Sequence, residues 1–108
     1  MLVTPECNAS FSAVLKNALD HLYAEWHDKP VALVGYGMAG GLRAVEALRP
    51  VVAGLRMLTV ATTLALSVNR VEHDAYYPGD GEEQGRATML AELAKLASAL
   101  RHRQEAPA

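Results

Sequence analysis

Short apolar runs alternate with longer stretches of helical periodicity along this chain. Residues 1–4 form a strand-like stub that stops at Pro5, because proline cannot donate to a sheet ladder. Between Phe11 and Trp26, apolar residues recur at helical spacing, which predicts one amphipathic helix. We expect Asn8 or Ser10 to cap the free amides at the start of this helix.

The middle of the chain repeats this strand-and-helix pattern. Val31 to Val34 is a continuous apolar run, which predicts a strand buried on both faces. A glycine-rich turn follows at residues 35–41, and a helical stripe predicts a second helix over residues 42–55. Pro50 lies inside that stripe and is expected to kink or restart the helix. Residues 57–68 then predict one strand, either extended or followed by a bulge.

The last third of the chain is predicted to contain a loop and a helix. Residues 73–85 are polar and glycine-rich, as in a surface loop, and a helix is predicted from about Glu83 to Arg101, before a frayed tail over residues 104–108. Strands separated by helices predict parallel pairing through right-handed crossovers. The fold class is therefore expected to be α/β, with helices on the faces of a parallel sheet.

Composition narrows the class of protein. Apolar residues make up 51% of the 108 residues, which is enough for a packed core within a single domain. The formal net charge of -2 argues against a sequence-independent nucleic-acid binder, which needs a basic stripe. No apolar run approaches the roughly 20 residues that span a bilayer, so no membrane partner is expected.

Cysteine and histidine usage adds two expectations. A single cysteine excludes an intrachain disulfide and fits a reducing cytoplasm, and the first ten residues lack the regions of a secretory signal. No group of His, Cys, Asp and Glu has the spacing of metal ligands, so no structural zinc is expected.

Two loops are candidates for binding chemistry, because ligands of open parallel sheets bind beyond the carboxyl ends of the strands. Residues 4–10 offer a rigid proline, several backbone amides and short polar side chains before a helix, which suits a planar heterocycle. In residues 35–41 the glycines allow backbone to approach a flat ring closely, and Tyr36 is placed to stack on it or close its edge.

Each loop also has a plain structural interpretation. A Pro-Glu-x-Asn turn alone is an ordinary helix entry, and glycines after a strand often only allow a helix to pack closely. Gly35, Gly37 and Gly40 have the spacing of a dinucleotide-binding fingerprint. However, residues 55–58 lack the acidic residue that should follow about 20 residues later.

Two sequence blocks resemble the NADPH-dependent FMN reductase family. The first is TPECNAS at residues 4–10 with LKNALD at residues 15–20, and the second is KPVALVGYG at residues 29–37 with GGLRAV at residues 40–45. The resemblance implies a three-layer flavodoxin-like parallel sheet, in which this chain supplies strands 3, 4 and 5 with their flanking helices. Residues 1–108 are then expected to form one partial flavodoxin-like domain.

The resemblance also implies a function and a site. FMN and NADPH, or NADH, are the implied cofactors, and the implied activity passes hydride through FMN to a flavin, a quinone or a similar acceptor. No catalytic side chain is expected, because the cofactor carries the chemistry. The implied ring-binding positions are backbone groups of two segments: Pro5, Glu6, Cys7 and Asn8, and Gly35, Tyr36 and Gly37.

Two departures from the family pattern leave a second hypothesis open. Cys7 stands where the family usually has tyrosine, and the family's first strand and phosphate loop would precede Met1. Residues 1–4 would then present an open sheet edge, so we expect a homo-oligomer, a complementing chain or a truncated reading of a longer gene rather than a stable monomer. The alternative function is a non-catalytic dimerising or partner-binding half-domain that has lost FMN binding.

Overall fold

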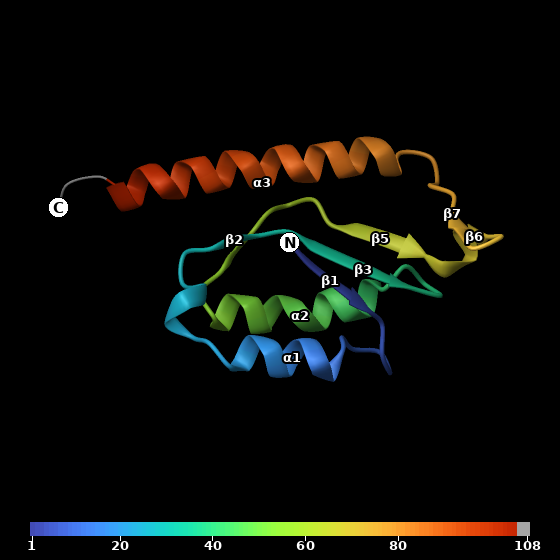
Figure 1. The fold of residues 1–108 in the computed structure, drawn as a ribbon, viewed down its shortest axis with the longest axis horizontal. Coiled ribbons are helices and arrows are strands. Elements are labelled where there is room, and N and C mark those ends of the chain that lie inside the picture. Colours follow the sequence, from blue (N-terminus) through green and yellow to red (C-terminus); the bar gives the residue numbers. More distant parts are fainter. Residues whose placement is uncertain (106–108) are drawn as a thin grey trace.

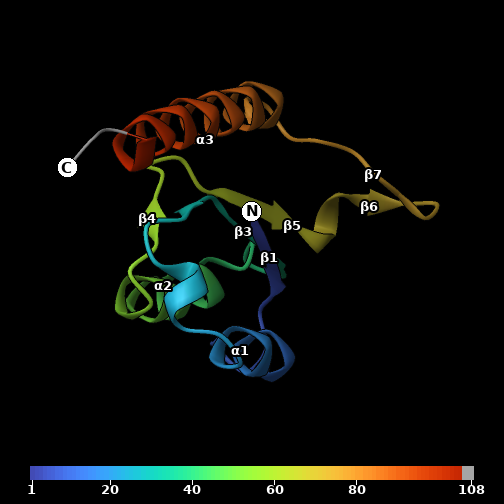
Figure 2. The same ribbon diagram turned by 60° about the vertical axis from the view of Figure 1, so that its left-hand side comes forward.

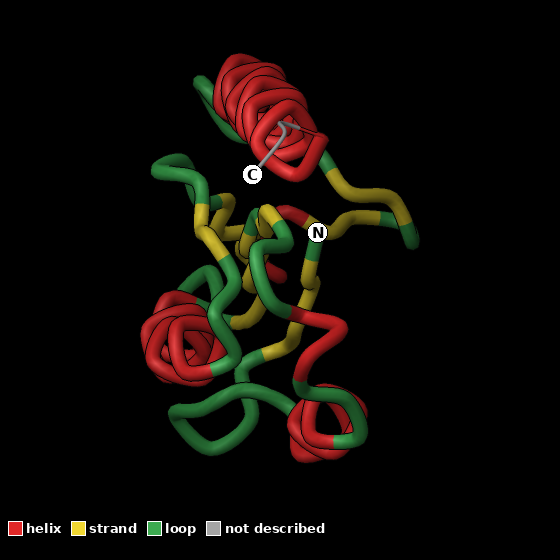
Figure 3. The backbone as a smooth tube through the Cα atoms, turned by 90° about the vertical axis from the view of Figure 1, so that its left-hand side faces the viewer, coloured by secondary structure: helices red, strands yellow, loops and turns green. Residues whose placement is uncertain are grey.

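The computed structural model describes residues 1–105, which form three layers: helices, a sheet and a further helix (Figure 1). In chain order the elements are β1 (Leu2–Pro5), α1 (Ala13–Asp20), the 3₁₀ turn η1 (Ala24–Trp26), β2 (Pro30–Val31), β3 (Leu33–Gly37), α2 (Leu42–Gly54), β4 (Leu58–Thr59), β5 (Leu64–Ser67), the 3₁₀ turn η2 (Val68–Arg70), β6 (Val71–Glu72), β7 (Ala75–Tyr76) and α3 (Glu82–Glu105). Seen from its end, the molecule has α1 and α2 on one side of the strands and α3 on the other (Figure 3).

The main sheet is parallel and has the order β1–β3–β5. β2 and β4 also pair in parallel, and they precede β3 and β5 in the chain. The β2–β4 ladder is therefore followed along the same two segments by the β3–β5 ladder. Val3 lies opposite Val34, and Val34 lies opposite Leu64. The predicted α/β class with a parallel sheet and flanking helices is confirmed.

The hydrophobic core is divided by the sheet. Beneath α1 and α2 it contains Leu19, Val31, Leu33, Val45, Leu48, Val52, Leu55 and Met57. Beneath α3 it contains Ala32, Val34, Val60 and Met89. Successive residues of the central strand thus point to opposite faces, and both faces are apolar because helices cover both.

The predicted helix from Phe11 to Trp26 is wrong in its second half. α1 ends at Asp20, and the indole Nε1 of Trp26 donates a hydrogen bond of 2.9 Å to the carbonyl oxygen of Leu19. The chain turns back so that the Trp26 ring packs against the core, and this burial outweighs continuation of the helix. The cap was also misassigned: Ser12 accepts from the amide of Val14 at 3.2 Å.

Pro50 does not restart the second helix, because α2 continues through it to Gly54. A proline inside a helix removes one backbone bond, while Val45, Leu48 and Val52 anchor the same helix in the core. The predicted strand over residues 57–68 is in fact two strands, β4 and β5, with an interruption at residues 60–63.

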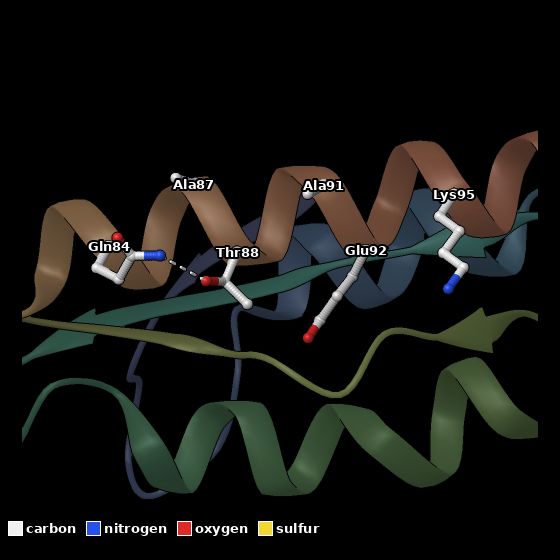
Figure 4. A pocket seen from close by; sticks show the side chains of 6 residues that line it. All are labelled: Gln84, Ala87, Thr88, Ala91, Glu92 and Lys95. Carbon is white, nitrogen blue, oxygen red and sulfur yellow. Dashed lines mark hydrogen bonds between the residues drawn. The ribbon is translucent and has the colours of Figure 1, made fainter.

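That interruption is tied to both helical layers. The carboxylate of Glu92 accepts from the amide of Thr62 at 2.9 Å and from its hydroxyl at 2.8 Å. On the other side, Arg49 donates to the hydroxyl of Thr63 at 2.9 Å. Figure 4 shows Glu92 reaching from α3 toward the strands. Backbone that leaves the ladder here is therefore held by side chains from α2 and α3.

The start of the predicted surface loop over residues 73–85 belongs to a hairpin that the sequence pattern did not indicate. β6 and β7 pair antiparallel across His73 and Asp74, whose φ angles are 47° and 62°. The hairpin extends away from the layered body (Figure 2). α3 begins at Glu82 and continues past Arg101 to Glu105, while the rest of the expected tail, residues 106–108, lies outside the described residues.

Among residues 1–105, no helix combines the length and apolarity needed to cross a membrane.

The start of α2 packs directly on the backbone of β3 through two glycines. A Cβ at Gly41 would lie 2.3 Å from the amide nitrogen of Tyr36, and one at Gly35 would lie 2.5 Å from the carbonyl oxygen of Gly41. Gly41 also has a φ of 69°, in the left-handed region. No side chain fits at either position while the helix stays where it is.

Substitution Gly41→Ala is therefore expected to reduce the free energy of unfolding by about 3 kcal/mol or more, through the backbone clash and the left-handed φ. Gly54→Ala is the matched control, because nothing lies within 4 Å of a Cβ built there. It should change stability by no more than about 1 kcal/mol, in the stabilising direction. Chemical denaturation of both variants checks this, and equal effects would contradict it.

Candidate functional site

The two predicted binding segments lie side by side at the carboxyl end of the sheet. We call residues 5–10 the first loop and residues 35–41 the second loop. Pro5 pairs with Tyr36 in the β1–β3 register, and the amide of Glu6 donates to the carbonyl oxygen of Tyr36 at 2.9 Å. The sheet ladder thus extends one bond beyond β1 and fixes the spacing of the loops.

The first loop is closed by a tight turn. Cys7 and Ser10 exchange two backbone hydrogen bonds, of 2.8 and 3.0 Å, across Asn8 and Ala9. Asn8 and Ala9 have φ angles of 52° and 63°, a conformation that is strained for alanine. Their own amides donate to no other group in residues 1–105. The turn therefore presents two backbone donors at the end of the sheet.

Thr4 fixes the base of the first loop. It is the one fully buried polar residue of the described chain, with 0% of its surface exposed. Its hydroxyl accepts from the amide of Ser12 at 3.2 Å and donates to the carbonyl oxygen of Pro5 at 2.9 Å. The start of α1 and the end of β1 are held together by this one side chain.

The second loop presents backbone on one side and an aromatic ring on the other. The amide of Gly40 donates to the carbonyl oxygen of Gly37 at 3.1 Å, and a Cβ at Gly37 would lie 3.3 Å from that of Glu6. Tyr36 is 40% exposed and belongs to the α3 face of the sheet. Gly35 is buried under α2, so its missing side chain serves helix packing.

Glu6 is poorly satisfied where the two loops meet. One carboxylate oxygen, Oε2, lies 3.9 Å from a guanidinium nitrogen of Arg43, while Oε1 is buried and has no partner among the described residues. The Glu6 side chain is 18% exposed, against 71% for Arg43. The carboxylate therefore sits between the first loop and the start of α2, facing the cation of that helix.

The cysteine and two of the histidines of the sequence make no further site. Cys7 is exposed at the turn as a free thiol. His21 bonds the carbonyl oxygen of Asn17 on its own helix, and the ring of His27 packs edge-on against Tyr23 at 4.7 Å. Within residues 1–105, no three His, Cys, Asp or Glu side chains are grouped to hold a metal ion.

The hairpin creates a hollow region that sequence reasoning missed. Two adjoining hollows of about 260 and 210 Å³ share Leu66 and Tyr76, and we call them together the hairpin cleft. The first hollow also reaches Tyr36 of the second loop. The signal for this cleft in the sequence was two exposed apolar residues, Val71 just before the predicted loop and Tyr76 within it.

Tyr76 is tied to the start of α3. Its hydroxyl lies 2.9 and 2.8 Å from the two carboxylate oxygens of Glu82. Partial burial, followed by the hydrogen bond and the negative charge of Glu82, raises the pKa of Tyr76 above its ordinary value of 10.0, and Arg70 opposes this shift. The tyrosine therefore keeps its proton at neutral pH, and the hydrogen bonds to Glu82, which we call the Tyr76–Glu82 clasp, are intact.

A separate depression of about 360 Å³ lies along one side of α3, where Gln84, Thr88 and Lys95 are among its lining residues (Figure 4). All of its lining residues belong to α3, and none belongs to either loop.

Comparison with known proteins identifies the family. The model of the NADPH-dependent FMN reductase family matches residues 1–70, which include β1, both loops and β5. This chain belongs to the NADPH-dependent FMN reductase family. The resemblance inferred from the two sequence blocks is thereby confirmed.

Individual relatives match this chain over different lengths. An NAD(P)H-dependent FMN reductase of Schizosaccharomyces pombe is 44% identical over 70 residues, which cover 65% of this chain and 35% of that protein. One from Saccharomyces cerevisiae is 47% identical over 57 residues, 53% of this chain and 30% of that protein. An FMN-dependent NADPH-azoreductase of Staphylococcus aureus is 36% identical over 99 residues, 85% of this chain and 52% of that protein. The chain thus spans between about a third and a half of these relatives.

The strain in the first loop can be tested by stability. Ala9→Gly should raise the free energy of unfolding by about 0.5–1 kcal/mol, because glycine adopts a φ of 63° without steric cost. Ala39→Gly is the matched control: the same change in another exposed turn, at a residue without positive φ, should be neutral or destabilising. Urea denaturation distinguishes the two, and a loss of stability in Ala9→Gly would show that the turn is unstrained.

Proposed function

We propose that this chain forms the ring-binding part of a flavin (FMN)-dependent NAD(P)H oxidoreductase that reduces a flavin, a quinone or a similar acceptor. The observation that carries the proposal is the hydrogen bond from Glu6 to Tyr36, which sets the two loops side by side. Family membership and the names of the relatives, two FMN reductases and an FMN-dependent azoreductase, support it. Because the chain spans about half or less of those proteins, their complete activity is proposed here.

The proposed contacts to the isoalloxazine ring are backbone contacts. Its carbonyl oxygens and ring nitrogens accept hydrogen bonds, and the unused amides of Asn8 and Ala9 are donors of the right kind. Gly37 adds no side chain between the loops. The other proposed ring-binding positions are Pro5, Glu6 and Cys7 in the first loop and Gly35 and Tyr36 in the second loop. The residues present therefore fit the ring of FMN.

FMN, when bound, supplies the redox chemistry: the nicotinamide loses a hydride, and an acceptor such as a quinone gains that hydride and a solvent proton to become a hydroquinone. The chain's own residues orient the ring and need no acid or base. The cation at these loops, Arg43, faces the carboxylate of Glu6. We therefore propose that the phosphate of FMN is held by residues outside the two loops.

Lumiflavin, which has the isoalloxazine ring without a phosphate, tests the ring site directly. We expect its addition to the purified full chain to shift backbone amide NMR signals of the two loops, with Asn8, Ala9 and Gly37 among the largest. Flavin fluorescence measures the affinity in parallel. Amides of the exposed side of α1, such as Asn17, serve as an internal control.

Shifts confined to the two loops, together with oxidation of NADPH when FMN is supplied, are the expected result. Failure of lumiflavin to shift these amides would refute the reductase proposal and favour the alternative, a half-domain that binds a partner without FMN. A weak affinity for FMN would not affect this test, because lumiflavin carries no phosphate and reports on the ring site alone.

We further propose that the activity requires a second chain against β1, either another copy or a complementing chain. In the described structure β1 pairs with β3 alone, and Val3 is 53% exposed. The backbone amides of Leu2 and Glu6 donate hydrogen bonds toward the β3 side. Because successive amides of a strand point to opposite sides, the amide of Val3 points away from β3. Pro5 has no amide hydrogen, so a pairing strand would depend on the amide of Val3.

We place the assembled protein in the reducing cytoplasm, since its single cysteine is a free thiol.

Val3→Pro tests this assembly, because it removes the outward amide and leaves the bonds toward β3 in place. We expect the wild-type chain to show a multimeric mass by light scattering and the variant to show a monomeric one. Val14→Ser, at an apolar residue of α1 that is 79% exposed, is the control and should keep the wild-type mass. A monomeric wild-type chain would rule out self-assembly through β1.

A further inference from the structure

The hairpin cleft is lined by two aromatic rings and by aliphatic side chains. Tyr36 and Tyr76 line the first hollow with Leu66, Val68 and Val71. Tyr36 comes from the second loop and Tyr76 from β7, so elements far apart in the sequence contribute the two rings. Concave sites lined by aromatic and aliphatic side chains with few polar groups are typical of small-molecule binding.

The Tyr76 wall is held in place. Its hydroxyl bonds both oxygens of Glu82, and the amide of Tyr77 donates to the carbonyl oxygen of Arg70 at 2.8 Å across the hairpin. The guanidinium of Arg70 covers Gly79, where a Cβ would meet it at 2.8 Å. A fixed ring opposite a sheet face favours a flat ligand, because little side-chain freedom remains to be lost on binding.

Charge at the cleft selects against anions. Glu82, Glu83 and Arg86 line the second hollow, and Arg86 pairs with Glu83 at 2.7 Å. Among residues 1–105, the carboxylate of Glu82 forms no ion pair, and it accepts a hydrogen bond from the hydroxyl of Tyr76. An anionic ligand would approach this uncompensated carboxylate, whereas an uncharged one would not.

Size and position narrow the ligand further. A hollow of about 260 Å³ accommodates one or two fused rings and is too small for a peptide helix. Tyr36 belongs to the same short segment that is proposed to hold the isoalloxazine ring, and its backbone bonds Glu6 of the first loop. A molecule in the cleft would therefore lie next to that ring.

We propose that the hairpin cleft is the acceptor subsite, and that it binds an uncharged planar aromatic molecule of the quinone class. This inference rests on the proposed function, since an acceptor needs the neighbouring flavin. It assigns β6 and β7 a role in substrate binding, with Tyr76 as a specificity-determining residue.

Duroquinone is the probe, because its fully substituted ring does not alkylate the free thiol of Cys7. Binding to the purified full chain is followed by backbone amide NMR, with lumiflavin titrated separately. We expect shifts at Leu66, Val68, Val71 and Tyr76. Tyr76→Ala should weaken duroquinone binding at least about fivefold through loss of ring contact.

Two further variants separate a local contact from unfolding of the hairpin. Tyr77→Ala removes a neighbouring tyrosine that is 53% exposed and lines neither hollow, so duroquinone affinity should stay at the wild-type value. Val68 lies in η2 and takes no part in the Tyr76–Glu82 hydrogen bonds. Val68→Ser should weaken duroquinone binding about threefold, because an apolar contact in the cleft is lost.

The outcomes of the two titrations are distinguishable. Lumiflavin binding without duroquinone shifts in the cleft would overturn the subsite and leave the reductase proposal standing. Duroquinone binding in the cleft without lumiflavin binding would refute the reductase and, with it, the acceptor role. Concentration-dependent shifts of the same amides without any ligand would show that a second copy covers the cleft, which also overturns the inference.

Discussion

The close approach of α2 to β3 is the constraint on which the rest of the structure depends. The two glycines at residues 35 and 41 bring helix backbone against strand backbone, with no room for a Cβ at either position. This contact ends β3 and starts α2 within one short turn. The second loop is therefore positioned by main-chain packing rather than by side chains, and the first loop is positioned in turn by its bond from Glu6 to Tyr36. A site made of backbone groups needs such rigidity, because no side-chain rotamer can compensate for a misplaced loop.

The sequence pattern predicted the layers well and the local deviations poorly. Buried runs such as Val31 to Val34 and the glycine turn after them follow rules that act along the chain, so the parallel sheet and both loops could be predicted. The end of α1 could not be predicted, because it depends on tertiary packing: Trp26 packs against the core and bonds the carbonyl oxygen of Leu19. The break between β4 and β5 has the same origin, since Glu92, thirty residues away, satisfies Thr62.

The hairpin shows a different limit of sequence reasoning. His73 and Asp74 form the tight turn with positive φ angles, a conformation usually signalled by asparagine and glycine. Without that signal, a polar segment with three glycines is interpreted as a loop. The apolar residues Val71 and Tyr76 did not by themselves predict a cleft under the hairpin, although one of its lining residues, Tyr36, was already a candidate. The sequence motifs predicted where the two loops lie, whereas residues that only the tertiary fold brings together, such as Leu66 and Tyr76, were not predicted to share a cleft.

The two faces of the sheet are covered unequally, and this asymmetry connects binding with assembly. α2 contacts β1 and β3 on one face, where Leu19 of α1 joins the same core cluster, whereas α3 lies over β2 and β5 on the other face. On the α3 face, Val3 and Tyr36 therefore remain exposed, at 53% and 40%. Both lie in the β1–β3 pair that carries the two loops. A chain that covered Val3 would thus approach the proposed ring site from the side opposite α2. It would exclude water from the face that Tyr36 shares with the hairpin cleft, where a dry environment strengthens every polar contact.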